Sequence, residues 1–320
     1  MGAVPGRHRL LAIGVVVMWG LNYTAIDLSL EHFPPMLLVA LRFGLIAIPT
    51  ILLVPRPNVP WRWVIGYGLG FGTLQFLLLH AGMAAGMPAG LASLVLQASA
   101  PLTVLLSAAF LHERLGPHHL VGIGLAVAGL AIVGWHRAGT TGLLPFLLVL
   151  GAAFGWAIGN ISNRLARPRN ALHLALWMCV VPPLPMLALS LVVEGPERIV
   201  RSLTMWSDPG AGVAVLALGY TVVIATVGGS GVWTWLMARH PTAAVAPFSL
   251  LVPVVGMAAA WFLLGQAITP VEIAGAALVI GGVLVASLWR RPFSAAAVGP
   301  AVGAPIAPSI AQPTPTTPAA

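Results

Sequence analysis

Long apolar segments follow one another from residue 10 to residue 289 of this chain, separated only by short polar stretches. Each has about 20 residues, the length that a helix needs to cross the hydrocarbon core of a bilayer. Only 7% of the 320 residues are charged and 59% are hydrophobic. A water-soluble domain carries about 25% charged residues, so this chain is predicted to be an integral membrane protein.

The segments are expected to be helices, because the alternating pattern of a membrane β-barrel strand is absent. The basic and apolar N-terminus is interpreted as an uncleaved first span. Prolines, glycines and charges divide the chain into ten predicted spans: 10–28, 36–54, 64–82, 90–111, 118–135, 142–164, 172–193, 212–237, 243–264 and 270–289. The predicted fold is an all-α membrane protein with ten transmembrane helices.

The arginines are distributed unevenly between the two ends of these spans. If the N-terminus is cytoplasmic, eleven arginines fall in cytoplasmic segments, and only Arg137, Arg198 and Arg201 are external. Cytoplasmic loops are enriched in arginine, so both termini of this multi-pass protein are expected to be cytoplasmic. The same asymmetry accounts for the net charge of +8 without a nucleic-acid partner.

The Pro- and Ala-rich tail, 294–320, is predicted to be a disordered cytoplasmic appendage.

Two stretches, 101–130 and 253–283, resemble each other. With one gap they align in four pairs: Pro101 with Pro253, Pro117 with Pro270, Gly122 with Gly275, and Gly129 with Gly282. Two repeats of five spans each are therefore predicted, at 8–137 and 142–291. Because five is odd, the second repeat is inverted relative to the first, which is a common transporter design.

A polar residue precedes each of the aligned prolines by four positions. A proline inside a helix leaves the carbonyl four residues earlier without its usual donor. Pro101 is therefore expected to free the carbonyl of Gln97, and Pro253 that of Ser249. Such groups persist in a membrane where protein or a water-filled cavity satisfies them. We expect Gln97 and Ser249 to frame a central site, although Gln97 could instead bond a neighbouring helix.

Amides and aromatic rings share helix faces elsewhere in the spans. Trp19 and Asn22 in the first span are matched by Trp156 and Asn160 in the sixth. Gln75 lies on an aromatic stripe of the third span. These residues are candidates for substrate binding; the alternative is that the amides join helices through hydrogen bonds.

Arg42 is the one arginine placed well inside a predicted span. An intramembrane charge indicates a functional site. Three roles are open at this stage: binding a substrate carboxylate, pairing with Asp27, or extending to the lipid headgroups.

Signatures of enzymes are absent from the sequence. HERLG resembles the start of a zinc-protease motif, but residue 116 is Gly where the second His belongs, and no phosphate-binding Walker loop occurs. We expect no catalytic residue, no metal and no cofactor. Transport would then be driven by a gradient, and a proton is a candidate coupling ion.

The motifs VVMWGLNY, RFGLIAIP, GNISN and LLVPVVG, together with GMPAGLASLVLQASAPLTVLL, resemble those of the EamA family of the drug/metabolite transporter superfamily. Within that family the similarity, from Leu10 to Trp289, is to bacterial amino-acid metabolite exporters of the O-acetylserine/cysteine type. The resemblance implies ten helices, two EamA repeats and export across the bacterial inner membrane.

The resemblance favours a secondary exporter of small zwitterionic, amino-acid-like metabolites that works by alternating access. The alternative is an exporter of cationic drugs or other small metabolites, for which Asp27 is the available carboxylate of the first span. An intramembrane enzyme is disfavoured. Two residues depart from the family pattern: Gln266 stands where a Glu is usual, and His80 stands where a small or apolar residue is expected.

Overall fold

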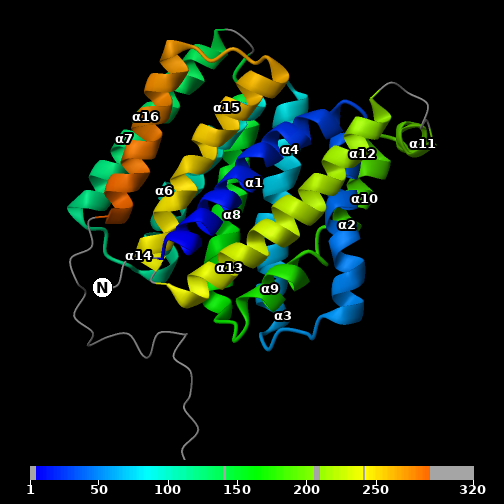
Figure 1. The fold of residues 1–320 in the computed structure, drawn as a ribbon, viewed down its shortest axis with the longest axis horizontal. Helices are drawn as coiled ribbons and strands as arrows, with labels where there is room; N and C mark the ends of the chain where they lie inside the picture. Colours follow the sequence, from blue (N-terminus) through cyan, green and yellow to red (C-terminus); the bar gives the residue numbers. More distant parts are fainter. Residues whose placement is uncertain (1–4, 140–141, 205–209, 241, 289–320) are drawn as a thin grey trace, which may run out of the picture. The chain divides into compact units, whose positions relative to one another are not determined.

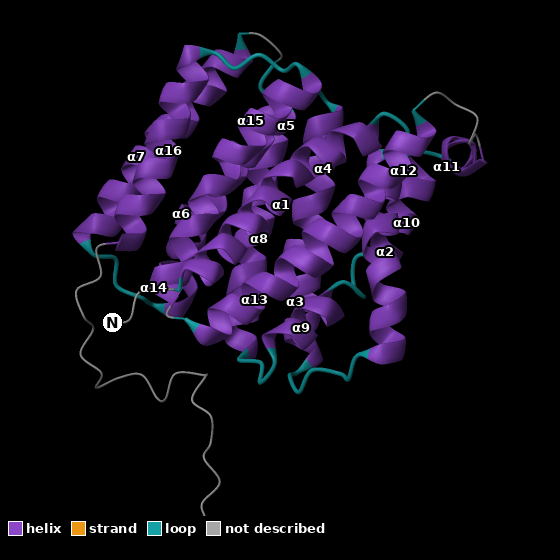
Figure 2. Ribbon diagram, in the orientation of Figure 1, coloured by secondary structure: helices purple, strands orange, loops and turns teal. Residues whose placement is uncertain are grey.

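The computed structural model describes residues 5–139, 142–204, 210–240 and 242–288. Within these residues all regular structure is helical (Figure 2). The predicted tail, 294–320, and the last residues of the second predicted repeat lie outside the described residues.

The long stretches of helix follow the predicted spans closely (Figure 1). In chain order the elements of the first five stretches are α1 (Gly6–Leu30), α2 (Pro35–Leu53), α3 (Trp61–Tyr67), η1 (Gly68–Gln75), α4 (Phe76–Ala84), α5 (Ala89–Val95), η2 (Leu96–Ala98), α6 (Ser99–Leu111) and α7 (Pro117–Ala138). Those that follow are α8 (Leu144–Ala166), α9 (Ala171–Met178), α10 (Pro183–Val193), α11 (Pro196–Thr204), α12 (Ala211–Gly219), η3 (Tyr220–Gly229), α13 (Ser230–Arg239), α14 (Thr242–Val245), η4 (Ala246–Leu251), α15 (Val252–Leu264) and α16 (Pro270–Leu288).

Nine helical stretches in the described part of the chain are long and apolar enough to cross a membrane. The tenth predicted span corresponds to a shorter apolar helix, Pro270–Ala286. The structure therefore agrees with an all-α, multi-pass membrane protein.

The seventh predicted span is not one continuous helix. It consists of α9 and α10, which are separated by turns at residues 179–182. Pro182 and Pro183 have no backbone N–H to donate, so an α-helical ladder cannot run through this point. The short helix α11 follows, in the segment that holds Arg198 and Arg201.

Four segments within the spans depart from α-helical geometry. Two are π-helical, η1 and η3, and two are 3₁₀-helical, η2 and η4. The 3₁₀ segments come directly before α6 and α15, which contain Pro101 and Pro253 near their first residues. The prolines thus change the helix type without interrupting the helix.

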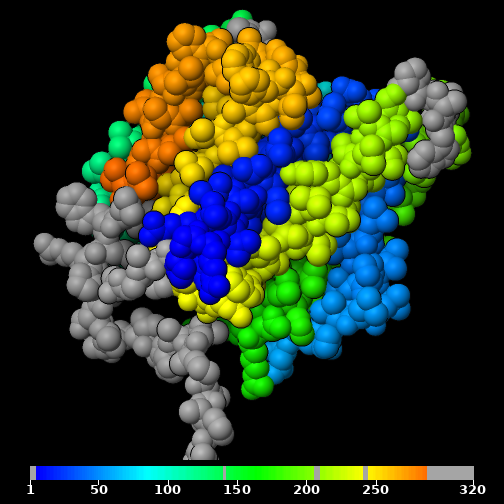
Figure 3. Space-filling view, viewed as in Figure 1, coloured from blue at the N-terminus to red at the C-terminus, as the bar shows by residue number. Residues whose placement is uncertain are grey.

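Two helices, α1 and α8, hold the central positions. α1 crosses the face seen in Figure 3 between α15 and the stretch formed by α12 and η3. α8 packs against α3, η1, α4 and α6. These two helices carry the Trp and Asn residues singled out in the sequence.

Helices α7 and α16 lie side by side (Figure 1) and approach each other at glycines. A Cβ atom at Gly122 would lie 2.5 Å from the carbonyl oxygen of Gly282, and one at Gly129 would lie 2.6 Å from that of Gly275. In a bilayer, helices associate mainly through such close packing, since lipid tails are as apolar as the side chains.

Replacing Gly122 by Val should separate α7 from α16, because the new side chain would overlap the backbone of α16. We expect a loss of about 1–3 kcal/mol of stability, the usual cost of overpacking. Thermal unfolding of the detergent-solubilised protein, followed by tryptophan fluorescence, measures the change. Gly124→Val is the matched control, since nothing lies within 4 Å of a Cβ there; equal unfolding temperatures of the two variants would contradict the role of this contact.

Candidate functional site

Trp19 on α1 is held by the π-helical segment η3. Its indole Nε1 donates to the carbonyl oxygen of Ala225 at 3.0 Å, and its ring lies 5.2 Å from that of Trp233. Gly229 makes this possible, because a Cβ there would lie 2.7 Å from the indole nitrogen. The indole N–H of Trp19, a predicted substrate-binding residue, therefore donates within the protein.

Arg42 on α2 is buried, with only 4% of its surface exposed. Its NH2 group donates to the Thr226 hydroxyl of η3 at 2.9 Å, and its guanidinium lies over the Phe76 ring, 4.4 Å from the centroid. Its Nε and NH1 atoms have no hydrogen-bond partner among the described residues. The guanidinium thus keeps two nitrogen donors free for another group.

Two of the three roles considered for Arg42 are wrong. Asp27 does not pair with it, since that carboxylate instead accepts from the Gln266 amide at 3.3 Å. Arg42 does not extend to lipid headgroups either, because its side chain is buried against Phe76 and Thr226. Binding of an anionic group remains.

Other buried polar atoms without partners lie on the helices next to α2. Phe76, which faces Arg42, also contacts the His80 ring at 5.8 Å. His80 bonds the Phe76 carbonyl through Nδ1, whereas its Nε2 has no partner. The Oε1 of Gln75 and the Oδ1 of Asn22 are likewise buried and unpaired among the described residues. Because buried polar atoms normally have partners, the unpaired atoms make each of these four side chains a candidate for contact with a ligand or water.

We call Arg42, Phe76, His80 and Thr226 the Arg42 cluster. A row of aromatic contacts connects it with α8: Phe76 to Phe71 at 5.8 Å, and Phe71 to Trp156 at 5.6 Å. Trp19 bonds Ala225, next to Thr226, and Gln75 directly precedes Phe76. The predicted site residues Trp19, Arg42, Gln75 and Trp156 are therefore linked through neighbouring contacts.

Two of the remaining predicted residues, Asn160 and Ser249, have hydrogen-bond partners away from the Arg42 cluster. Asn160 donates to the Thr103 hydroxyl at 3.1 Å, and this bond joins α8 to α6. Ser249 donates to the carbonyl of Ala246 at 2.7 Å. Gln97 is half-buried, and among the described residues neither it nor Ser249 hydrogen-bonds to the Arg42 cluster.

The expectation that Pro101 and Pro253 leave carbonyls unpaired is wrong. The N–H of Ser99 points at the carbonyls of Leu96 and Gln97, and the N–H of Val252 donates to Ser249. The bond to Ser249 spans three residues, as in a 3₁₀ turn, whereas the Ser99 N–H is shared between Leu96, three residues earlier, and Gln97, two residues earlier. The polar side chains stay at these positions, but their carbonyls are not free ligand groups.

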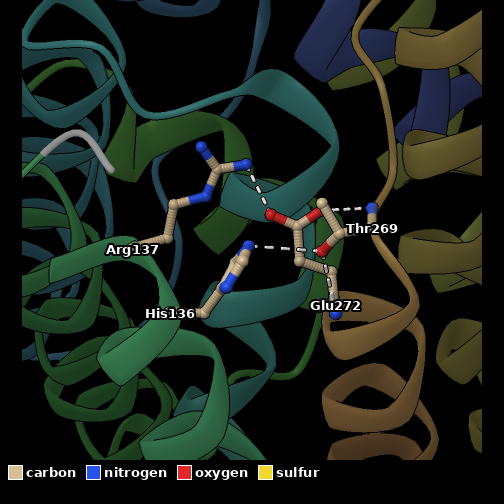
Figure 4. A network of polar contacts seen from close by, with 4 residues as sticks. All are labelled: His136, Arg137, Thr269 and Glu272. Atoms are coloured by element: carbon tan, nitrogen blue, oxygen red, sulfur yellow. Dashed lines mark hydrogen bonds and ion pairs between the residues drawn. The ribbon is translucent and has the colours of Figure 1, made fainter. Parts of the chain in front are cut away.

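A second polar network, shown in Figure 4, joins the end of α7 to the start of α16. Glu272, only 1% exposed, accepts from Arg137 at 2.5 Å and from the N–H of Thr269 at 2.9 Å, while His136 contacts the Thr269 hydroxyl at 3.4 Å. Thr269 and Glu272 form a capping box, which T-x-x-E signals in the sequence. The adjoining void has a volume of about 10 Å³, room for one water at most, so this network joins helices.

The departure at Gln266 has a physical consequence here. Its amide donates to the Asp27 carboxylate, so the residue links the end of α15 to α1. A Glu at this position would instead place two carboxylates face to face. Thr226 was not among the predicted site residues, because its place just before the small residues of 228–231 favoured a role in close helix packing.

The sequence profile described as the EamA-like transporter family matches residues 8–135 and 143–288. A protein of Salmonella typhimurium named "Probable amino-acid metabolite efflux pump" is 44% identical over 87% of this chain and 94% of its own length. An Escherichia coli protein with the same name is 40% identical over 92% of this chain and 99% of its own length.

A solved structure described only as a crystal structure of a protein superimposes with a TM-score of 0.56. The superposition covers 89% of this chain and 98% of that one, at 24% sequence identity. The two chains therefore share a fold.

The exposure of Gln97 can be tested by cysteine labelling in a Cys179→Ala background, since Cys179 is the single cysteine. Gln97 is half-buried while its neighbour Leu96 is 1% exposed. Gln97→Cys should react with a small polar thiol reagent much faster than Leu96→Cys, because thiol reactivity requires access. Equal, slow labelling at both positions would show that Gln97 is packed between helices.

Proposed function

Because the chain belongs to the EamA-like transporter family, we propose that it exports small zwitterionic, amino-acid-like metabolites of the cysteine and O-acetylserine type. It is a transporter and not an enzyme. One observation carries the proposal: Arg42 is buried beside a hydroxyl and an aromatic ring, with two nitrogens unpaired. An uncompensated buried charge is costly, and a substrate carboxylate is the group that would neutralise it.

The other end of a zwitterion is an ammonium group, which needs acceptors. Asn22 and Gln75 offer buried, unpaired amide oxygens on α1 and η1. α1 and α4 both pack against α2, and Gln75 directly precedes the Phe76 that faces Arg42. The aromatic faces of Phe71 and Trp156 add surface for an apolar or acyl substituent.

Export of cationic drugs is the less favoured alternative. A cation near the Arg42 cluster would meet a like charge, and the carboxylate of Asp27 is already engaged by Gln266.

The proposed mechanism is alternating access by ten helices arranged as two inverted repeats. Support comes from features that occur once in each half: a π segment in the third and eighth spans, and a 3₁₀ segment in the fourth and ninth. The glycine contacts between α7 and α16 are also reciprocal.

The two ends of the fourth and ninth spans differ in packing, which supports the same mechanism. α5 packs on α15, where a Cβ at Gly90 would lie 2.9 Å from the Cα of Met257. Among the described residues, no comparable packing joins α6 to η4. With cytoplasmic termini in a bacterial inner membrane, α5 and α15 close the outer side. A proton is the candidate coupling ion.

Arg42→Gln should abolish most transport of amino acids, because a neutral amide cannot form an ion pair with a carboxylate or neutralise its charge. Hydrogen bonds to charged groups contribute about 1.5–3 kcal/mol, which corresponds to a loss of about 10- to 100-fold. The loss of transport is measured as the uptake of labelled L-cysteine into vesicles that contain the purified protein. Arg56→Gln, which alters an arginine stacked on Trp61 in a connecting segment, is the matched control and should transport normally. Normal transport by Arg42→Gln would refute the proposed site.

The proposed topology predicts the behaviour of reporter fusions. A reporter that is active only in the cytoplasm should be active when fused after Arg290 and after Arg114, and inactive when fused after Arg198. Activity after Arg198, or its absence after Arg290, would contradict the ten-span arrangement with cytoplasmic termini.

A further inference from the structure

The π-helical segment η3 places a hydroxyl beside Arg42 in an orientation that an α-helix would not provide. In a π-helix the backbone bonds run to the residue five positions earlier. The Thr226 hydroxyl donates to the carbonyl of Thr221, also five positions earlier, at 2.6 Å. Because its proton is committed there, its lone pairs are left to accept from the NH2 group of Arg42 at 2.9 Å.

Arg42 is held by few contacts besides this one. The Phe76 ring covers the guanidinium, but a ring contact does not fix rotation within the plane of the group. The hydrogen bond to Thr226 is therefore the contact that sets where the unpaired Nε and NH1 donors point. An arginine side chain has many rotamers, and a fixed fork loses less entropy when it binds a carboxylate.

Ala225, the residue before Thr226, accepts a hydrogen bond from a second candidate binding residue, Trp19. Two consecutive residues of η3 therefore hold side chains from α1 and from α2. π-helical turns occur frequently at functional sites, and here one turn orients an indole and a guanidinium together.

We propose that Thr226 is a positioning residue that sets the preference of the transporter for carboxylates by orienting Arg42. The inference rests on the proposed function and names a residue beyond it. Thr226 acts through Arg42: without its hydroxyl, the guanidinium points correctly in only a fraction of the molecules. Apparent affinity falls by that fraction, and the transport step itself is unaffected.

Thr73 in the other π-helical segment, η1, offers a matched control. Its hydroxyl oxygen is buried and has no hydrogen-bond partner among the described residues. Thr226→Val and Thr73→Val therefore make the same chemical change in the same type of helix, but only the first removes a bond to Arg42. Thr226→Ser keeps that bond and serves as the rescue variant.

The experiment measures initial rates of labelled L-cysteine uptake by the full chain in vesicles, with L-cysteine and L-cysteinamide as competitors. If a tenth of the molecules keep Arg42 oriented, Thr226→Val raises the KM for L-cysteine about tenfold, with little change in maximal rate. Inhibition by L-cysteinamide should not change, because that compound has no carboxylate. Thr226→Ser and Thr73→Val should both behave as the wild type.

Distinct results separate the failure of this inference from the failure of the proposed function. If the wild type transports L-cysteine and Arg42→Gln does not, but Thr226→Val keeps the wild-type KM, the positioning role is wrong and the proposed function stands. Equal increases in the KM for L-cysteine in Thr226→Val and Thr73→Val would also overturn the positioning role. So would a loss of inhibition by L-cysteinamide in Thr226→Val as large as the loss of affinity for L-cysteine. If the wild type does not transport L-cysteine, the proposed function fails and this inference falls with it.

Discussion

The absence of water from the hydrocarbon core obliges each polar group in a span to find its partner within the protein. Helices meet this requirement for the backbone, and the departures from α geometry meet it in other ways. At Pro253 a 3₁₀ turn lets the N–H of Val252 reach Ser249. In η3 the carbonyl of Ala225 accepts a hydrogen bond from the indole of Trp19. Irregular backbone in this protein therefore creates contacts between helices.

The same requirement applied to charges distinguishes Arg42 from other arginines. Arg137 lies against the buried carboxylate of Glu272, and Arg164 pairs with Glu113. Arg42 lies deeper in a span, yet its described contacts are the Thr226 hydroxyl and the rings of Phe43 and Phe76, all uncharged. A buried charge without a counter-charge costs free energy, and this cost is the reason for our proposal that a transported ligand supplies the counter-charge.

Similar backbone geometry recurs where α6 and α15 end. His112 and Gly265 both adopt left-handed conformations, with φ of 54° and 65°. The next N–H in each case, from Glu113 and Gln266, reaches back six residues to a helix carbonyl. The side chains differ: Glu113 forms an ion pair with Arg164, whereas Gln266 donates its amide to Asp27. The two helix ends therefore share a backbone conformation. They differ in the side-chain contact, which is an ion pair at the first and an amide-to-carboxylate hydrogen bond at the second.

Hydropathy and arginine placement in the sequence were sufficient to predict a helical membrane protein and the approximate bounds of its spans, because crossing a bilayer demands long apolar segments whatever their neighbours are. Its position inside a predicted span was also enough to single out Arg42 as a candidate site residue. Its partner did not follow from the sequence, which offered Asp27, but helix packing placed Thr226 beside Arg42 and Gln266 beside Asp27. Nor did the sequence reveal that the carbonyls near Pro101 and Pro253 have donors. These partners are 184 and 239 residues apart in the chain. Such pairings, and the choice between α, π and 3₁₀ turns, depend on how the helices pack, so only the tertiary structure decided them.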